Sequence, residues 1–240
     1  MQNEIGCTDL RVAVTGGTAG LGLALVRLLV ARGARVAFVA RTARSVERIA
    51  AETGACGIVG DVGRKEDIYP VAMQITGNLG GLDALIHNAS ALGPAPLALL
   101  ADTECEQLEQ AISVNLLGPF RLTKALFGAL AASARAGRGA AVIAISSDAA
   151  LTPYPKWGAY GASKAALRHL TAIWDREAST HGISFLSIDP GDMDTALHAL
   201  AVPEADPATL RRPEESAADI VESLLAVLPG RALRPLAVRT

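Results

Sequence analysis

Short runs of β-branched and apolar residues, separated by longer segments with helical patterning, limit the folds open to this chain more than any other feature. The runs lack polar alternation, as strands do when a sheet is covered on both faces. They occupy residues 11–16, 34–40, 56–62, 82–88, 140–146, 183–189 and, more weakly, 233–238. Strands that alternate with helices favour a parallel sheet. We therefore predict an α/β fold: a single Rossmann-like, doubly wound parallel sheet of about seven strands, flanked by helices.

Length, charge and cysteine content exclude several classes of protein. The 240 residues suffice for a substantial core, so we expect a single domain over 1–240. The formal charge of -2 gives no reason to expect nucleic-acid or membrane partners. The cysteines Cys7, Cys56 and Cys105 are odd in number and lack metal-ligand spacing, so we predict reduced thiols and no metal site. The start MQNEIGCTDL has no secretory pattern, which favours a cytoplasmic protein.

One long segment, 191–212, has the pattern of neither a strand nor a helix. It contains Pro203 and Pro207, and it separates the run at 183–189 from a last helix that should begin near Pro213. Irregular segments of this length inside a compact domain are usually functional. We predict that 191–212 is a lid over a substrate site.

A glycine-rich turn, TGGTAGLG at 15–22, follows the first predicted strand and opens a helix. Gly16, Gly20 and Gly22 leave room for a pyrophosphate, and the helix start offers free backbone N–H groups to that anion. A tight strand-to-helix corner without any ligand also favours glycine, so the motif alone leaves both interpretations open. Its position in the first βαβ unit favours a dinucleotide site. The coenzyme contacts expected here are Thr15, Gly16, Thr18, Gly20, Leu21 and Gly22.

The residues after this turn are basic where a site for NAD usually carries an acid. Sites that prefer NAD place Asp or Glu about 20 residues on, but no acidic residue occurs between Asp9 and Glu47. Ala40 and Arg41 stand at the end of the second predicted strand, where that carboxylate would lie. Arg binds phosphate through charge-assisted hydrogen bonds. We predict that Arg41 contacts a 2′-phosphate and that NADP(H) is preferred over NAD(H); a solvated strand-end charge is the alternative.

Two further predicted strands end in residues that should face the same crevice. Asp61 can accept a hydrogen bond from the adenine amino group, and the N–H of Val62 can complement it. Asn88 and Ala89 follow the fourth strand. Because the carboxyl ends of parallel strands meet at one edge of a sheet, all four lie near the expected coenzyme. Capping of the strand ends explains these residues equally well.

Tyr160 and Lys164, in YGASK, lie four residues apart, so on a helix they share one face. Such a pair is common on helix surfaces, where it forms a cation-π or hydrogen-bonded contact. Ser147, at the end of the fifth predicted strand, and Asn115, in a helix, should converge on it at the carboxyl edge of the sheet. A free Tyr has a pKa of about 10, so proton exchange at neutral pH needs a nearby positive charge. A Ser hydroxyl can donate to an oxygen on which charge develops.

These motifs, in this order and over nearly the whole chain, resemble the short-chain dehydrogenase/reductase family; the matching segments are TGGTAGLG, HNAS, YGASK and DPGDMDT. The resemblance implies an NAD(P)-dependent oxidoreductase that interconverts a carbonyl and an alcohol by hydride transfer. It implies that Tyr160 is the general acid/base and that Lys164 lowers its pKa and holds the nicotinamide ribose. It also implies that Ser147 orients the substrate oxygen and that Asn115 anchors a proton-relay water. The remaining coenzyme contacts that it implies are Asn88, Pro190, Gly191 and Thr195.

The sequence departs from the family pattern at two points. His87 and Ser90 replace the usual Asn and Gly of the fourth-strand motif, and we predict that His87 is a packed strand-end residue rather than a second catalyst. The end LRPLAVRT lacks the family's usual Gly, which puts the oligomer contact often made there in doubt. The helices of Asn115 and Tyr160 remain candidates for a subunit interface, so we expect a homodimer or a homotetramer.

Substrate contacts are expected before the helix of Tyr160 and within 191–212. Tyr154 and Trp157 can stack an aromatic substrate or simply pack their loop. Asp192 and Asp194 can meet a cationic group, although caps at the start of a lid helix are the favoured interpretation. The candidate substrate residues are Asp148, Leu151, Tyr154, Pro155, Trp157 and Met193.

Two alternatives for the function stay open. A catalytically silent NADP(H)-sensing or scaffold protein would keep the fold, although it would need no proton relay. At the level of the substrate, PGDMDTALH resembles sepiapterin-reductase-like members, which reduce dicarbonyl side chains. The partner expected in the enzymatic cases is a small-molecule carbonyl or alcohol.

Overall fold

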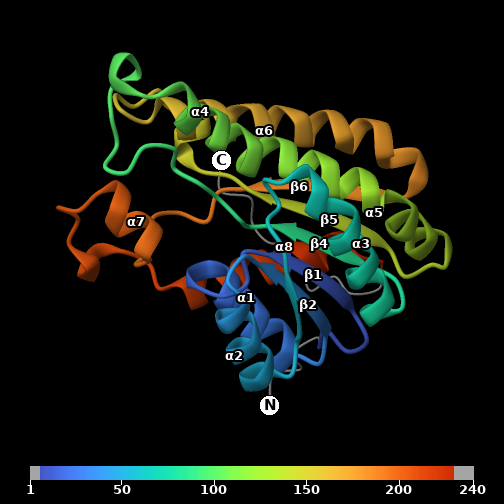
Figure 1. Cartoon of the computed structure of the whole chain (residues 1–240). Helices are drawn as coiled ribbons and strands as arrows, with labels where there is room; N and C mark the ends of the chain where they lie inside the picture. Colours follow the sequence, from blue (N-terminus) through green and yellow to red (C-terminus); the bar gives the residue numbers. More distant parts are fainter. Residues whose placement is uncertain (1–5, 230–240) are drawn as a thin grey trace.

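A six-stranded parallel sheet, with the strand order β3-β2-β1-β4-β5-β6, forms the centre of the molecule in the computed structural model, which describes residues 6–229 (Figure 1). Every strand falls inside a run predicted from the sequence, and the doubly wound α/β fold is confirmed. The seventh expected strand, at 233–238, lies outside the described residues. The strands are β1 Arg11–Thr15, β2 Arg35–Ala40, β3 Cys56–Val59, β4 Ala84–His87, β5 Ala140–Ile145 and β6 Ile183–Ile188.

Helices cover both faces of the sheet (Figure 1). The helices α1, α2 and α8 pack on one face, while α3, α5 and α6 pack on the other, with α4 against α6. No helix in the described part of the chain has the length and apolar character of a membrane span. The α-helices are α1 Gly20–Ala31, α2 Ala43–Thr53, α3 Lys65–Leu79, α4 Cys105–Ile112, α5 Gly118–Arg135, α6 Gly158–Ala178, α7 Ala196–Ala201 and α8 Pro213–Val227. Shorter turns are η1 Leu100–Asp102, η2 Ser113–Leu117, η3 Asp148–Ala150, η4 Ser179–His181 and η5 Pro207–Thr209.

Two apolar clusters, one on each face of the sheet, hold these layers together. Leu25 of α1 and Leu224 of α8 are fully buried on one face, and Ile75 of α3 and Leu122 of α5 on the other. Burying a side chain of this size contributes about 1.5–3 kcal/mol. Because the strands bury both faces, their apolar runs are continuous, which is why the sequence pattern located them.

The amino edge of the sheet is held by a buried ionic cluster. Asp83, just before β4, is fully buried and pairs with Arg11 and Arg138, at 2.7 Å to each guanidinium. Burial alone raises the pKa of Asp83, but hydrogen bonds from Arg138 and Arg11 outweigh it and hold that pKa well below its usual range. The cluster ties β1, β4 and the end of α5 together at the edge opposite the carboxyl ends of the strands.

The segment 191–212 is more regular than its sequence pattern indicates. It contains α7 and η5, and its two ends pair with each other through a parallel bridge between Met193 and Arg211. The N–H of Arg211 donates to the Asp192 carbonyl oxygen, and the N–H of Asp194 donates to the Arg211 carbonyl oxygen, both at 3.0 Å. The prediction of an irregular segment was therefore wrong, because sequence periodicity reports local structure and not pairing between distant ends. The last helix, α8, begins at Pro213 as predicted.

Candidate active site

A crevice of about 920 Å³ lies at the carboxyl edge of the sheet. Residues just after successive strands form its floor: Gly16 after β1, Arg41 after β2, Asp61 after β3, Asn88 after β4 and Ser147 after β5. The helix α7 covers one side. The volume lies within the range of about 300–1,000 Å³ typical of small-molecule sites.

The glycine turn fits an extended anion at the start of α1. Gly20 has a φ of +48° and lines the crevice, and a Cβ there would lie 3.2 Å from the Cγ2 atom of Thr195. Gly16, Thr18, Gly20 and Leu21 all line the crevice, as predicted.

Thr15 and Gly22, which are also predicted to contact the coenzyme, are not among the residues that line the crevice. A Cβ at Gly22 would collide with the carbonyl oxygen of Gly16 and come within 2.5 Å of the Asn88 Nδ2 atom. Gly22 therefore lets α1 pack closely beneath the turn. The Oγ1 atom of Thr15 accepts hydrogen bonds from the N–H groups of Asn88 and Ala89, at 3.0 and 3.1 Å. Thr15 thus joins the end of β1 to the end of β4.

The far end of the crevice presents unpaired basic charge. Arg41 is exposed and lines the crevice, and its guanidinium has no hydrogen bond or ion pair with any residue of the described part. Arg64, which was not predicted as a site residue, lines a smaller neighbouring cavity together with Arg41. Asp61 also lines both cavities; its Oδ1 atom accepts from the N–H of Gly63 at 2.9 Å. Val62, Asn88 and Ala89 line the crevice as well.

Tyr160 and Lys164 lie buried on one face of α6, at 8% and 2% exposure. Lys164 Nζ donates to the Ile145 carbonyl oxygen at 2.7 Å and lies 5.5 Å from the centroid of the Tyr160 ring. Burial lowers the pKa of Lys164 to about 8. The tyrosine and lysine thus meet inside the crevice wall and not on a helix surface.

Burial also raises the pKa of Tyr160 to about 12, so the phenol is protonated at neutral pH. The hydrogen-bonding neighbours that lower this pKa are Ser90 and Ser147. Lys164 is not among the groups that lower this pKa, since with a pKa of about 8 its amine is largely neutral where the phenol titrates.

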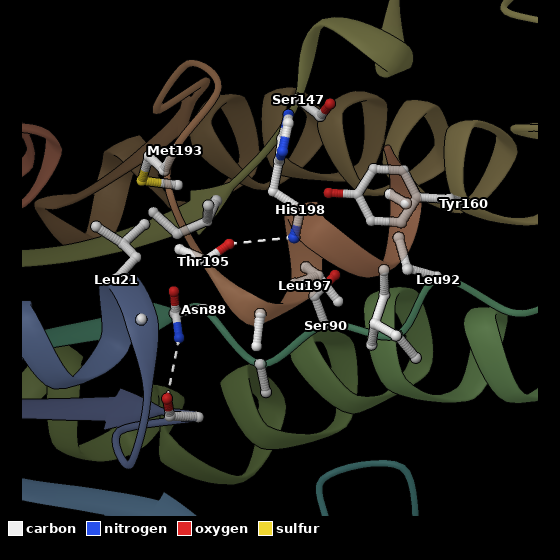
Figure 2. A pocket seen from close by; sticks show the side chains of 18 of the residues that line it. Leu21, Asn88, Ser90, Leu92, Ser147, Tyr160, Met193, Thr195, Leu197 and His198 are labelled. Atoms are coloured by element: carbon white, nitrogen blue, oxygen red, sulfur yellow. Dashed lines mark hydrogen bonds between the residues drawn. The ribbon is translucent and has the colours of Figure 1, made fainter. Parts of the chain in front are cut away.

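Two serines surround the Tyr160 hydroxyl. Ser147 Oγ donates to Asp148 Oδ1 at 3.0 Å and accepts from the N–H of Ala149 at 3.2 Å. Ser90 was noted in the sequence only as a departure from the family's Gly, yet it lines the crevice. Figure 2 shows Ser90, Ser147 and Tyr160 around the same space.

Asn115 lies in a π-helical turn, Ser113–Leu117, of the kind often found at functional sites. Its Nδ2 atom donates to the Ala91 carbonyl oxygen and to Ser163 Oγ, both at 2.8 Å. Its Oδ1 atom accepts from the N–H of Ala91 and from Ser90 Oγ. Since protein groups occupy the whole amide, any contact with a relay water must come from the main chain of Asn115.

The predicted substrate residues Asp148, Tyr154, Trp157 and Met193 all line the crevice, whereas Leu151 and Pro155 do not. The Tyr154 hydroxyl donates to Asp148 Oδ2 at 2.8 Å. The ring of Trp157 packs edge-on against Tyr160, with centroids 5.6 Å apart. Trp157 therefore packs its loop against α6.

The start of α7 corrects another expectation. Thr195 is the N-cap, and its Oγ1 atom accepts from the N–H of His198 at 3.2 Å, so neither Asp192 nor Asp194 caps this helix. Pro190, Gly191 and Thr195 line the crevice as predicted. The carbonyl oxygen of Pro190 accepts from Ser216 Oγ at 2.8 Å, which fixes the start of the 191–212 segment on α8.

Two histidines have different surroundings. His87 is buried and its Nε2 atom forms a hydrogen bond with Thr123 Oγ1 at 2.8 Å, which agrees with a packed strand-end residue. Burial lowers its pKa to about 3. His198, which the sequence reading did not select, projects from α7 into the crevice. No local sequence pattern distinguishes it from a surface histidine.

Known proteins resemble this chain in sequence and in fold. A family model described as short chain dehydrogenase matches residues 11–205. The L-fucose dehydrogenase of Mus musculus is 32% identical over 229 residues, which cover 95% of this chain and 78% of that protein. The 2,5-dichloro-2,5-cyclohexadiene-1,4-diol dehydrogenase of Sphingobium indicum is 32% identical over 188 residues, covering 78% of this chain and 73% of that protein. The crystal structure of a dehydrogenase/reductase from Sinorhizobium meliloti is 27% identical, with a TM-score of 0.80 and coverage of 95% and 92%.

Proposed function

Because the chain belongs to the short-chain dehydrogenase/reductase family, whose relatives are oxidoreductases of CH–OH groups, we propose that it interconverts an alcohol and a carbonyl with NADP(H) and uses Tyr160 as general acid/base. The observation that carries this proposal is the position of the buried Tyr160 hydroxyl. It faces Ser147 and Ser90 in the crevice that also holds the glycine turn. A sensing or scaffold protein has no need of that arrangement.

The residues of the crevice fit a dinucleotide. The glycine turn would receive the pyrophosphate at the start of α1, Asp61 and Val62 would meet the adenine, and Arg41 and Arg64 would meet the 2′-phosphate. Pro190, Gly191 and Thr195, which line the crevice, would hold the nicotinamide end. When bound, the coenzyme supplies or accepts a hydride, so that one carbonyl, one hydride and one proton give one alcohol.

The side chains of this protein handle the proton and the charge. Tyr160 gives its phenolic proton to the substrate oxygen during reduction and takes a proton from the alcohol during oxidation. Ser147 donates a hydrogen bond to the same oxygen, where negative charge develops. Lys164 is protonated below pH about 8, and its charge beside the ring favours the phenolate. Asn115 holds the loop after β4 against α6 and so keeps Ser90 in place.

The proposed preference for NADP(H) rests on Arg41. A charge-assisted hydrogen bond contributes about 1.5–3 kcal/mol, which corresponds to about 10- to 150-fold in affinity. We expect wild-type kcat/KM to be higher with NADP than with NAD, and Arg41→Asp to reduce that ratio by about 10- to 150-fold. Arg176→Asp, at an exposed position of α6 outside the crevice, is the matched control. A coenzyme ratio that Arg41→Asp leaves unchanged would overturn the assignment.

We propose a cyclic secondary alcohol as substrate. The names of both relatives describe ring compounds that carry hydroxyl groups. The crevice agrees with a hydroxylated ring, since apolar Leu92, Trp157 and Leu197 line it together with the polar side chains around Tyr160. A panel of cyclic secondary alcohols, assayed by reduction of NADP, and of linear dicarbonyl compounds, assayed by oxidation of NADPH, tests this proposal. Activity confined to linear dicarbonyl compounds would favour the sepiapterin-reductase-like alternative.

A further inference from the structure

His198 carries a ring nitrogen that is buried in the crevice without a partner. Its Nδ1 atom is inaccessible to solvent and forms no hydrogen bond with any described residue. The side chain is only 14% exposed and lines the same crevice as Ser147 and Tyr160. In Figure 2 the ring rises from α7 toward Ser147, on the side to which the Tyr160 hydroxyl points. Buried polar atoms normally have partners. Because Nδ1 has no accessible surface in this structure, a ligand group meets it only when the ring turns about its side-chain bonds. The unpartnered nitrogen therefore indicates a ring that turns to meet a group arriving with the ligand.

The surroundings of the ring indicate which group that is. Asp192 Oδ1 lies 3.8 Å from His198 Nε2, so the carboxylate favours a proton on Nε2. A neutral imidazole with its proton on Nε2 has an acceptor at Nδ1. The acceptor requires a donor from the substrate, and the common donor on a small alcohol is a second hydroxyl.

The charge of the crevice excludes one competing class of substrate. Asp148, Asp189 and Asp192 line the crevice, and Asp192 lies 3.8 Å from His198 Nε2, whereas the cations that line it are Arg41 at the far end and Lys164, which donates to Ile145. A carboxylate or phosphate on the substrate would meet like charge here. The acidic surroundings therefore favour a neutral polyhydroxy compound over an acid.

We infer that His198 is a specificity-determining residue that accepts a hydrogen bond from a second hydroxyl of the substrate, so that the enzyme prefers vicinal diols and hydroxyketones over the corresponding monofunctional compounds. This inference rests on the proposed function and adds to it a residue and a substrate pattern. Asp148, which already accepts from Ser147 and Tyr154, borders the same space. The second hydroxyl thus lies between α7 and the loop that carries the reacting groups.

A paired substrate panel tests the inference. The probes are cyclohexane-1,2-diol against cyclohexanol and cyclopentane-1,2-diol against cyclopentanol, each oxidised with NADP and with NAD by the full-length protein. When a buried acceptor loses its hydrogen-bond partner, kcat/KM changes by about 5- to 150-fold. We expect wild-type kcat/KM to favour each diol by at least about 5-fold, and His198→Leu to reduce that ratio toward one. His169→Leu, the same exchange at an exposed position of α6, should keep the wild-type ratio.

The outcomes separate the inference from the function on which it rests. A wild-type enzyme that oxidises the alcohols without preferring the diols, or a preference that His198→Leu leaves intact, overturns the inference and leaves the oxidoreductase proposal standing. A wild-type enzyme that oxidises none of the four compounds with either coenzyme counts against the cyclic-alcohol proposal, and the inference falls with it. Circular dichroism of both leucine variants checks that each is folded.

Discussion

Replacing Gly22 with alanine tests how closely α1 packs beneath the glycine turn. A Cβ at this position would collide with the Gly16 carbonyl oxygen and crowd Asn88 Nδ2 at 2.5 Å. Neither neighbour moves freely, since one is backbone and the other donates to the carbonyl oxygens of Thr15 and Gly16 at 3.0 and 3.2 Å. The substitution must therefore shift α1 or break the contacts of Asn88.

The magnitude follows from three contributions. Overpacking costs about 1–3 kcal/mol, and the two hydrogen bonds of Asn88 contribute about 1 kcal/mol each. The higher helix propensity of alanine offsets about 1 kcal/mol. We expect Gly22→Ala to lower the free energy of unfolding by about 2–4 kcal/mol and to weaken NADP binding, because the turn proposed to receive the pyrophosphate is displaced.

Equilibrium unfolding in urea, followed by tryptophan fluorescence, measures this change. The matched control is Gly77→Ala in the exposed interior of α3, where a Cβ would meet no atom within 4 Å. That variant should gain about 0.5–1 kcal/mol, because alanine restricts the unfolded chain and favours the helix. If Gly22→Ala is as stable as Gly77→Ala, the close packing described for the turn is wrong.

Two further predictions concern charges in the core. Burial lowers the pKa of His87 from 6.5 to about 3 on folding. Protonation therefore favours the unfolded chain as the pH falls below 6.5. The free energy of unfolding should decrease by about 2 kcal/mol between pH 7 and pH 5 for this reason. Urea titrations should show that His87→Leu removes that part of the pH dependence, and an unchanged pH dependence would contradict the burial of a neutral imidazole. Asp83→Asn should lower the free energy of unfolding by about 2–4 kcal/mol, since Arg11 and Arg138 lose a buried carboxylate but retain some access to solvent. Its kcat should match that of the wild type, because the cluster lies at the edge of the sheet opposite the crevice; a large fall in kcat would contradict that separation.

The sequence predicted the sheet well for a physical reason. Strands that bury both faces are apolar throughout, so β4 and β5 are visible in the sequence without any knowledge of their neighbours. The residues just after each strand could then be assigned to one edge, because parallel strands align their carboxyl ends. This argument alone brought Arg41, Asp61, Asn88 and Ser147 into one crevice, as the structure does.

Contacts that depend on tertiary packing were not predictable in this way. Gly22 resembles its neighbours in the glycine motif, and only the position of Asn88 shows that it serves packing. The pairing of Met193 with Arg211 joins residues eighteen positions apart and leaves no periodic signal. The position of His198 in the crevice depends on that pairing, because the bridge carries α7 back over the sheet edge.

The roles of individual site residues also depend on their partners. The sequence placed Asn115 near the site, but only its hydrogen bonds show that the side chain is fully used in holding the loop after β4. Likewise, the spacing of Tyr160 and Lys164 predicts that the two side chains lie close together. It does not predict whether charge or burial has the larger effect on the pKa of the phenol. In the structure burial dominates and raises the pKa of the phenol.

The most direct test of proton transfer by Tyr160 is the rate of the Tyr160→Phe variant, measured together with its binding of NADPH. General acid–base catalysis contributes about 10²- to 10⁴-fold. We expect kcat/KM to fall by at least about 100-fold while the dissociation constant for NADPH changes by less than about 3-fold, because the ring stays in place and only the hydroxyl is lost. A variant that binds NADPH and turns over at a near-normal rate would show that another group moves the proton.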